Sequence, residues 1–322
     1  MIFCDADSRC FVTSLDDIDD SNMAIDNFAA ASSSDTDRPV ASSAEVPLRT
    51  GPPTREELLV HYPAKFTWEQ LKTFVNSGDL GLLKRDKKLQ IRYDEWAKGM
   101  RERYGSIVNY LWDHRLQWGN PDTLSLLPSR LSNCAPESTP ESTQVSSDWS
   151  SKDSQPQRPT VPPDAPSYFT ADTPPEYISI IMNDWPYSVP PEVEHTLIWT
   201  RIPIIPPDLP PSIAPRIAQD GLWGFTGSDS PPPSPSLLPS YLPALSEWGV
   251  TMDKLVRSPK GTDEEEALVK KDGDEIAKFI KRRWSEDEWE TAWFVNPPRL
   301  QSVPGLAHIH VFARYKGPDS QT

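Results

Sequence analysis

The chain has 322 residues, of which 36 are proline, and this proline share is about twice the roughly 5 % of an average protein. Apolar residues make up 37 %, below the usual range of about 45–50 %. We therefore expect one folded domain interrupted by proline-rich segments, although the length alone would allow two. The net charge of −15 disfavours nucleic-acid binding, because a negative surface repels phosphate backbones.

The acidic residues are unevenly placed, since residues 1–50 hold ten acidic and three basic side chains. With little apolar periodicity, this segment is predicted to be a disordered leader. Cys4, Cys10 and Cys134 form neither a disulfide framework nor a zinc pattern. We find no apolar run of about 18 residues and no signal-peptide pattern, so we expect no membrane association. The sequence thus predicts a reduced, intracellular protein in the cytoplasm, with a nuclear location also open.

Helical patterns come first along the chain. A short helix is expected within 51–62, and a second at 66–77, where Thr67 and Gln70 have the spacing of a capping box. Residues 88–118 carry the longest helical pattern, with a break expected near Gly105, because glycine weakens a helix by about 1 kcal/mol relative to alanine.

Strand patterns follow in the second half. Two strands are expected at 178–182 and 196–200, an amphipathic helix at 263–284, and two further strands at 291–296 and 306–315. Helices and hairpins without βαβ alternation predict an α+β domain. The predicted organisation is a disordered leader (1–50), a helical part (51–120), a disordered insertion (121–166), a first strand pair (167–205), a disordered proline-rich insertion (206–246), a helix with a second strand pair (247–316) and a tail (317–322).

His308 and His310 are the strongest candidates for chemistry. Residues two apart on a strand point to the same face, so both imidazoles can act on one ligand. Imidazole can bind a metal, move protons or attack phosphorus. The alternative is two partly buried histidines that are merely hydrogen-bonded.

Polar residues precede this histidine strand and could hold phosphate oxygens. Asn296, Gln301 and Ser302 supply amides and a hydroxyl, and Arg299 supplies a cationic fork. The alternative is an ordinary polar turn. No glycine-rich phosphate loop, nucleophile elbow or Cys-x-x-Cys pair occurs.

A third group lies between the first two predicted strands. Asp184 could accept a hydrogen bond from a sugar hydroxyl, Trp185 and Tyr187 could stack on a ring, and His195 opens the second strand. The alternative is that Asp184 caps a turn and the aromatic side chains belong to the core. A metal site made of His308 and His310 with His195 or Asp184 ranks last, so we expect neither a metal nor a cofactor.

Several sequence blocks together resemble the fungal N-acetylglucosamine-induced protein family, an uncharacterised domain family. The similarity implies a fungal intracellular protein linked to the response to N-acetylglucosamine, and it implies no reaction. The blocks that carry it, in chain order, are FTWEQLKTFV, RYDEW, YGSIVNYLWDHRLQW, NDWPYSVPPEVEHTLIWT and WFVNPPRLQSVPGLAHIHVFAR.

The C-terminal half also resembles the histidine-triad (HIT) fold of nucleotide hydrolases and transferases. That family has an acidic residue after its first strand, a histidine opening the second, a helix, then Asn, Gln-Ser-Val and a His-x-His-x-His strand. The chain has the same order in Asp184, His195, Asn296, Gln301-Ser302-Val303 and His308-Ile309-His310. The chain departs from this pattern in two ways. It has two strand histidines where the family has three, and four residues, Pro304 to Ala307, separate Val303 from the first of them.

The resemblance implies an antiparallel HIT-like sheet with a site for a nucleotide or phosphosugar, and a strand histidine that transfers or hydrolyses a phosphoryl or nucleotidyl group. Aligning the end of the strand makes His308 the nucleophile, whereas aligning its first histidine makes it His310. The alternative function is a non-catalytic regulatory protein that recruits protein partners through its acidic leader and proline-rich insertions, including PPPSPS at 231–236.

Overall fold

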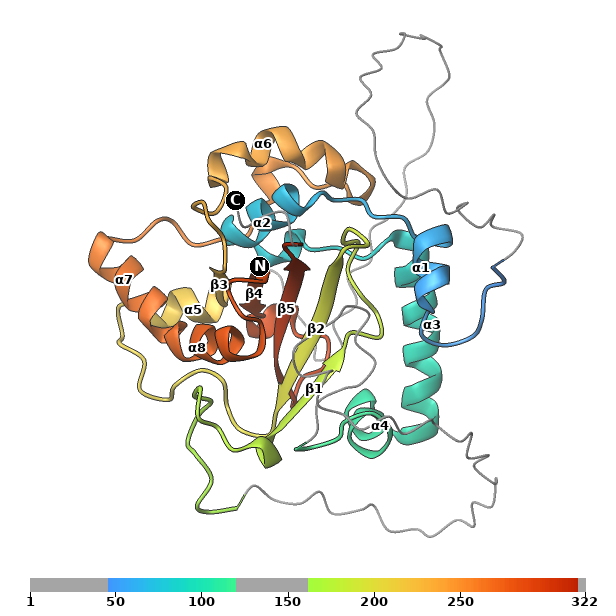
Figure 1. Cartoon of the computed structure of the whole chain (residues 1–322), viewed down its shortest axis with the longest axis horizontal. Coiled ribbons are helices and arrows are strands. Elements are labelled where there is room, and N and C mark those ends of the chain that lie inside the picture. The colour runs from blue at the N-terminus through green and yellow to red at the C-terminus, as the bar shows by residue number, and fades with distance from the viewer. Residues whose placement is uncertain (1–45, 120–161, 318–322) are drawn as a thin grey trace, which may run out of the picture. The chain divides into compact units, whose positions relative to one another are not determined.

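The computed structural model describes residues 46–119 and 162–317, all of which belong to one compact unit. Figure 1 shows the arrangement of its elements. The helices are α1 (Arg55–His61), α2 (Trp68–Asn76), α3 (Lys87–Tyr104), α4 (Ile107–His114), α5 (Ala214–Asp220), α6 (Leu238–Tyr241), α7 (Asp263–Asp272) and α8 (Asp274–Arg283). The strands are β1 (Ile178–Met182), β2 (Val193–Thr200), β3 (Leu222–Thr226), β4 (Trp289–Val295) and β5 (Ala307–Tyr315).

Helix α2 begins where its capping residue predicts. Thr67 accepts a hydrogen bond from the backbone N–H of Gln70, whose side chain accepts from the N–H of Thr67, so the predicted capping box is confirmed. The long predicted helix breaks at Gly105, whose φ of 77° lies in the left-handed region that favours glycine. Ser106 then caps α4, so the expected break divides α3 from α4.

The predicted helix at 263–284 is wrong in one respect, because it is two helices that meet at Gly273. A Cβ atom at Gly273 would lie 2.8 Å from the Trp293 ring of β4. Only glycine therefore allows the α7–α8 junction to approach the sheet this closely.

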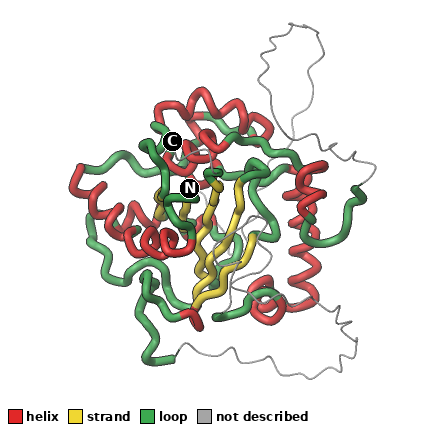
Figure 2. Tube along the Cα trace, viewed as in Figure 1, coloured by secondary structure: helices red, strands yellow, loops and turns green. Residues whose placement is uncertain are grey.

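Within the described residues, five strands form one antiparallel sheet in the order β1-β2-β5-β4-β3. β5 is the central strand and β2 is one of its two neighbours, with Leu197 opposite His310 and Trp199 opposite His308. Figure 2 shows the strands with helices beside them. Helices and an antiparallel sheet confirm the predicted α+β class.

The prediction of a disordered insertion at 206–246 is wrong. This segment contains α5, the edge strand β3 and α6, and its residues Ile213 and Leu222 are buried in the core. Proline misled the interpretation, because several prolines stand at the first turns of helices, where their missing N–H costs nothing. The PPPSPS string lies on the surface beside α2, where Asn76 donates a hydrogen bond to the Pro233 carbonyl.

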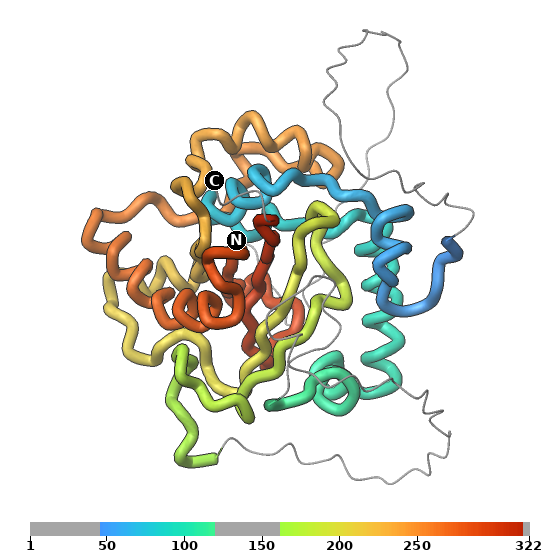
Figure 3. Tube along the Cα trace, viewed as in Figure 1, coloured from blue at the N-terminus to red at the C-terminus, as the bar shows by residue number. Residues whose placement is uncertain are grey.

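Helices cover both faces of the sheet. Ile309, Val311 and Ala313 of β5 pack toward α5 and α8, through Ile217 and Ile280. The opposite face packs on α2, α3, α4 and α6. In Figure 3 the blue and green N-terminal helices therefore lie across the sheet from α8, which is drawn in orange. The histidines of β2 and β5 lie on the face covered by the N-terminal helices.

Two predicted segments fall largely outside the described residues. The leader at 1–50 is described only from residue 46, and the insertion at 121–166 only from residue 162. Cys4, Cys10 and Cys134 also lie outside the described ranges. In the part of the chain that is described, no helix is both long and apolar enough to cross a membrane.

Candidate functional site

Three histidines meet on one face of the sheet. His195 comes from β2, and His308 and His310 come from β5. Strand alternation places His308 and His310 on one face, and the β2–β5 register places His195, Leu197 and Trp199 on that same face. All three histidines are buried. The two halves of the chain therefore build one imidazole cluster.

A chain of hydrogen bonds fixes the protons of two of these rings. The backbone N–H of Tyr187 can only donate, and it donates to Nδ1 of His195 (3.2 Å). The proton of His195 is then on Nε2, which lies 3.0 Å from Nδ1 of His310. His310 in turn carries its proton on Nε2, which lies 3.2 Å from Nδ2 of the Asn296 amide; exchanging the oxygen and nitrogen of that amide lets its oxygen accept the proton. Both nitrogens of His310 are thus engaged.

His308 is bonded differently. Its Nδ1 lies 3.1 Å from the carbonyl oxygen of Leu306, which can only accept, so Nδ1 carries the proton of the neutral ring. Nε2 then carries the lone pair, and it makes no hydrogen bond to any described residue. The ring packs on Trp199, with centroids 4.2 Å apart. His308 therefore has one nitrogen anchored and the other available.

Burial keeps all three imidazoles neutral. It lowers the pKa of His308 to about 4, an effect partly offset by the Leu306 hydrogen bond. Burial also lowers the pKa of His195 and of His310 well below their ordinary value, and the positive charge of Arg85 adds to the shift of both. At neutral pH the cluster is therefore a set of uncharged donors and acceptors.

A cavity of about 50 Å³ lies against this cluster. Its polar lining side chains are Arg85, Asn183, Asp184, Ser302, His308 and His310. Trp185 and Trp199 also line it, and their buried indole N–H groups find no hydrogen-bond partner among the described residues. Buried donors without partners are uncommon in folded proteins.

Asp184 and Trp185 line the cavity but already have partners. Asp184 forms an ion pair with Arg115, which follows α4, with Nε 2.9 Å from Oδ2. This contact differs from the turn-capping role considered from the sequence. Trp185 is 4 % exposed and packs against Tyr93 and Trp96 of α3, so its ring belongs to the core.

The structure separates Arg299 from the predicted site. Its guanidinium donates to the carbonyl oxygens of Gln219 and Val256 and lies 3.4 Å from the Asp79 carboxylate. These three acceptors hold the Arg299 side chain away from the histidines. Gln301 reaches the cluster only indirectly, since its Nε2 lies 3.3 Å from the backbone oxygen of Asn296.

Arg85 takes the place that the sequence analysis assigned to Arg299. It precedes α3, donates to the Trp185 carbonyl (2.8 Å) and lies over the rings of Tyr93 and Tyr187. No local pattern marks Arg85, because it reaches the site only through tertiary packing. Trp199 could have been found, since alternation along β2 puts it on the face of His195.

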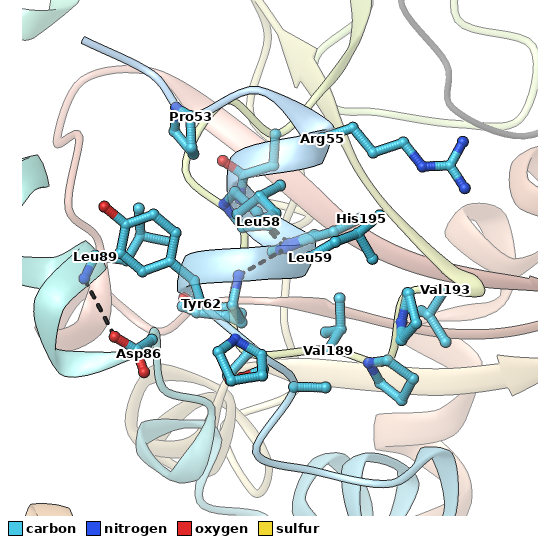
Figure 4. A pocket seen from close by; sticks show the side chains of 18 of the residues that line it. Pro53, Arg55, Leu58, Leu59, Tyr62, Asp86, Leu89, Val189, Val193 and His195 are labelled. Atoms are coloured by element: carbon cyan, nitrogen blue, oxygen red, sulfur yellow. Dashed lines mark hydrogen bonds between the residues drawn. The ribbon is translucent and has the colours of Figure 1, made fainter. Parts of the chain in front are cut away.

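A second, larger pocket of about 440 Å³ adjoins the cluster (Figure 4). His195 lines it, and Asn183 and Asp184 line both it and the smaller cavity. Most of its lining is apolar and includes Pro53, Leu58, Leu59, Tyr62, Leu89 and Val189. In the described ranges, no group of three or more His, Cys, Asp or Glu side chains is arranged to hold a metal ion.

Comparison with known proteins gives a family and two weaker likenesses. The model of a family described as "Protein of unknown function (DUF3605)" matches residues 67–211 and 255–314. N-acetylglucosamine-induced protein 1 of Candida albicans is 24 % identical over 139 residues, which is 43 % of this chain and 44 % of that relative. The chain thus spans less than half the length of that relative.

This chain is also similar to a solved structure titled "Crystal Structure of HTC1", at 20 % identity and a TM-score of 0.36. The similarity covers 77 % of this chain and 85 % of the other. The segment between the two family-matched ranges, 212–254, holds α5, β3 and α6.

Proposed function

We propose, for a chain that belongs to the family described as protein of unknown function (DUF3605), that the histidine cavity binds the phosphoryl group of a nucleotide or phosphosugar. In this proposal His308 attacks that group, which then passes to water or to an acceptor. The anchored tautomer of His308 carries the proposal. Its Nδ1–H is bonded to the Leu306 carbonyl, and its ring lines a cavity with Nε2 unprotonated.

A nucleophilic imidazole needs a lone pair that points at the phosphorus atom. Nε2 of His308 has this lone pair at neutral pH, because the lowered pKa keeps the ring uncharged. His310 is less suited, since both its nitrogens are engaged by His195 and Asn296. These contacts favour His308 over His310 as the nucleophile and give His310 a positioning role.

The remaining lining groups suit an oxyanion. The Arg85 guanidinium and the Ser302 hydroxyl line the cavity and are donors, and phosphate oxygens are acceptors. Donors fixed in a buried site stabilise developing negative charge without reorganisation. A volume of about 50 Å³ has room for only a few water-sized groups, which matches a phosphoryl group and excludes a whole nucleotide.

The proposed reaction has two steps. Nε2 of His308 forms a bond to phosphorus as the phosphorus–oxygen bond to the leaving group breaks, and the electron pair leaves with that oxygen. The phosphorylated ring keeps its Nδ1 proton, and the hydrogen bond to Leu306 stabilises the positive charge that the ring acquires. The oxygen of water, or of an acceptor hydroxyl, then bonds to phosphorus and releases its proton to solvent, while the nitrogen–phosphorus bond breaks and its electron pair returns to Nε2.

Calorimetric titration of the full chain with adenosine diphosphate and with glucosamine 6-phosphate tests binding, and intact-mass spectrometry after mixing tests for an acid-labile histidine adduct. We expect His308→Gln to lose the adduct and any turnover. His114→Gln, at an exposed histidine of α4, is the matched control and should change neither. Absence of binding by both compounds, or an adduct that survives His308→Gln, contradicts the proposal.

The name of the Candida albicans relative supports a second, biological proposal. We infer that this chain takes part in the response to N-acetylglucosamine. Its transcript level should then rise when cells are transferred from glucose to N-acetylglucosamine, relative to an unrelated housekeeping transcript. An unchanged ratio between the two transcripts counts against it.

A further inference from the structure

The larger pocket beside the histidines has no role in the function proposed above. It lies between α1, the start of α3 and the loop joining β1 to β2, as Figure 4 shows. Its volume of about 440 Å³ is within the range of about 300–1,000 Å³ that is usual for small-molecule sites. It is therefore large enough for a ring-sized group.

Apart from the exposed Arg55, the charged side chains of this pocket are already engaged. Asp86 pairs with Lys65, at 3.4 Å, and the backbone N–H of Lys65 donates to the Ser188 hydroxyl. Asp184 forms its ion pair with Arg115. A ligand rich in hydroxyl groups would therefore find few free partners here, and each buried hydroxyl left unpaired costs about 1–3 kcal/mol.

The pocket adjoins the smaller cavity. Asn183 and Asp184 line both spaces. His195 lines the larger pocket and is bonded to His310, which lines the cavity. The two spaces are therefore neighbours, with the His195–His310 pair beside both.

We propose that the larger pocket holds the apolar, ring-shaped part of the ligand whose phosphoryl group occupies the histidine cavity. This inference rests on the function proposed above and narrows its ligand class. Leu58, Leu89 and Val189 offer apolar contact to the faces of a ring and few hydrogen bonds to its substituents. The site therefore selects phosphate compounds that carry an aromatic ring, as nucleotides do, over phosphates of hexoses.

Titration of the full chain with three probes tests the selection: inorganic phosphate, phenyl phosphate and glucose 6-phosphate. Inorganic phosphate reports the cavity alone. Phenyl phosphate should bind at least about tenfold more tightly than inorganic phosphate, a difference of about 1.4 kcal/mol. Glucose 6-phosphate should bind no more tightly than inorganic phosphate.

Two variants test whether the larger pocket is responsible for the tighter binding of phenyl phosphate. Ala64→Trp places a bulky ring at an exposed position that lines the pocket, and Leu58→Ala removes part of its apolar wall. Both should reduce the tenfold advantage of phenyl phosphate to less than threefold and leave the affinity for inorganic phosphate unchanged. Ile91→Ala is the control, because this α3 residue is 60 % exposed and does not line the pocket.

The possible results separate the two proposals. If no phosphate compound binds, the proposed function fails and this inference fails with it. If inorganic phosphate binds but phenyl phosphate gains nothing, or glucose 6-phosphate binds more tightly, the ring inference alone is overturned. A pocket filled by another segment of the chain would also give no gain. An advantage for phenyl phosphate that survives Ala64→Trp overturns the assignment to this pocket.

Discussion

Nε2 of His195 lies 3.0 Å from Nδ1 of His310, although 115 residues separate them in the sequence. The contact crosses from β2 to its neighbour β5, the central strand of the sheet. Both rings are buried, so each depends on the other for a hydrogen bond that water cannot supply. The pair therefore links the stability of the domain to the geometry of the candidate site.

Replacing His195 by phenylalanine should destabilise the domain. The ring volume is roughly kept, but Nδ1 of His310 loses its partner, and an unsatisfied buried polar group costs about 1–3 kcal/mol. Urea unfolding followed by tryptophan fluorescence measures the loss. His114→Phe, at an exposed position of α4, should change the unfolding free energy by less than about 0.5 kcal/mol. Equal effects of the two substitutions would argue against the buried hydrogen bond.

The histidine cluster should make the fold sensitive to acid. The pKa of His308 is about 4 in the folded protein and near its ordinary value of 6.5 when unfolded, so the unfolded chain binds the proton first as the pH falls. The stabilisation is fully present above pH 6.5 and is lost toward pH 4, by about 3 kcal/mol for this group.

The contribution of His308 can be isolated by comparing the native chain with His308→Gln. Unfolding free energies measured at intervals from pH 7.5 to 4.5 should fall more steeply for the native chain, because glutamine does not titrate. The carboxylates titrate in both proteins, so their contribution cancels in the difference. Parallel pH profiles would show that the buried His308 is not responsible.

The Arg115–Asp184 ion pair should hold α4 against the end of β1. Both side chains are mostly buried and bonded at two points, so their coupling should exceed that of a surface pair. A double-mutant cycle with Arg115→Met and Asp184→Asn should give a coupling free energy of about 1–2 kcal/mol in urea unfolding. A value near zero would mean that the pair is no stronger than an exposed one.

Two glycines should respond to alanine in opposite directions. Gly224 of β3 faces Trp293, and a Cβ atom there would lie 2.5 Å from the ring, so Gly224→Ala should cost about 1–3 kcal/mol. Gly99 of α3 has nothing within 4 Å of such an atom, so Gly99→Ala should stabilise by about 0.4–1 kcal/mol. Thermal unfolding of both variants measures the two effects.

The Gly224 result bears directly on the corrected segment 206–246. If β3 is part of the cooperative core, the whole domain unfolds in one transition, and Gly224→Ala lowers the melting temperature of that transition. A normal melting temperature for this variant would instead support the original expectation that the segment is a loose insertion.

Local signals determined most elements of this protein. The capping box of Thr67, the helix break at Gly105 and the alternation of β5 each depend on residues within a few positions, so the sequence alone reveals them. The two-residue spacing of His308 and His310 likewise placed them on one face. β3 was missed because prolines surround a short strand whose pairing with β4 is not local.

The site itself was decided by tertiary structure. The sequence nominated His195, Asn296 and His310, but only the β2–β5 register connects them through hydrogen bonds. The nominated Arg299 is held elsewhere by Asp79, while Arg85, which no pattern marks, lines the cavity. Side-chain type and spacing specify which groups can act, whereas the meeting of distant segments sets their partners, protonation and access to a ligand. For that reason the choice between His308 and His310 as the proposed nucleophile rested on the fold.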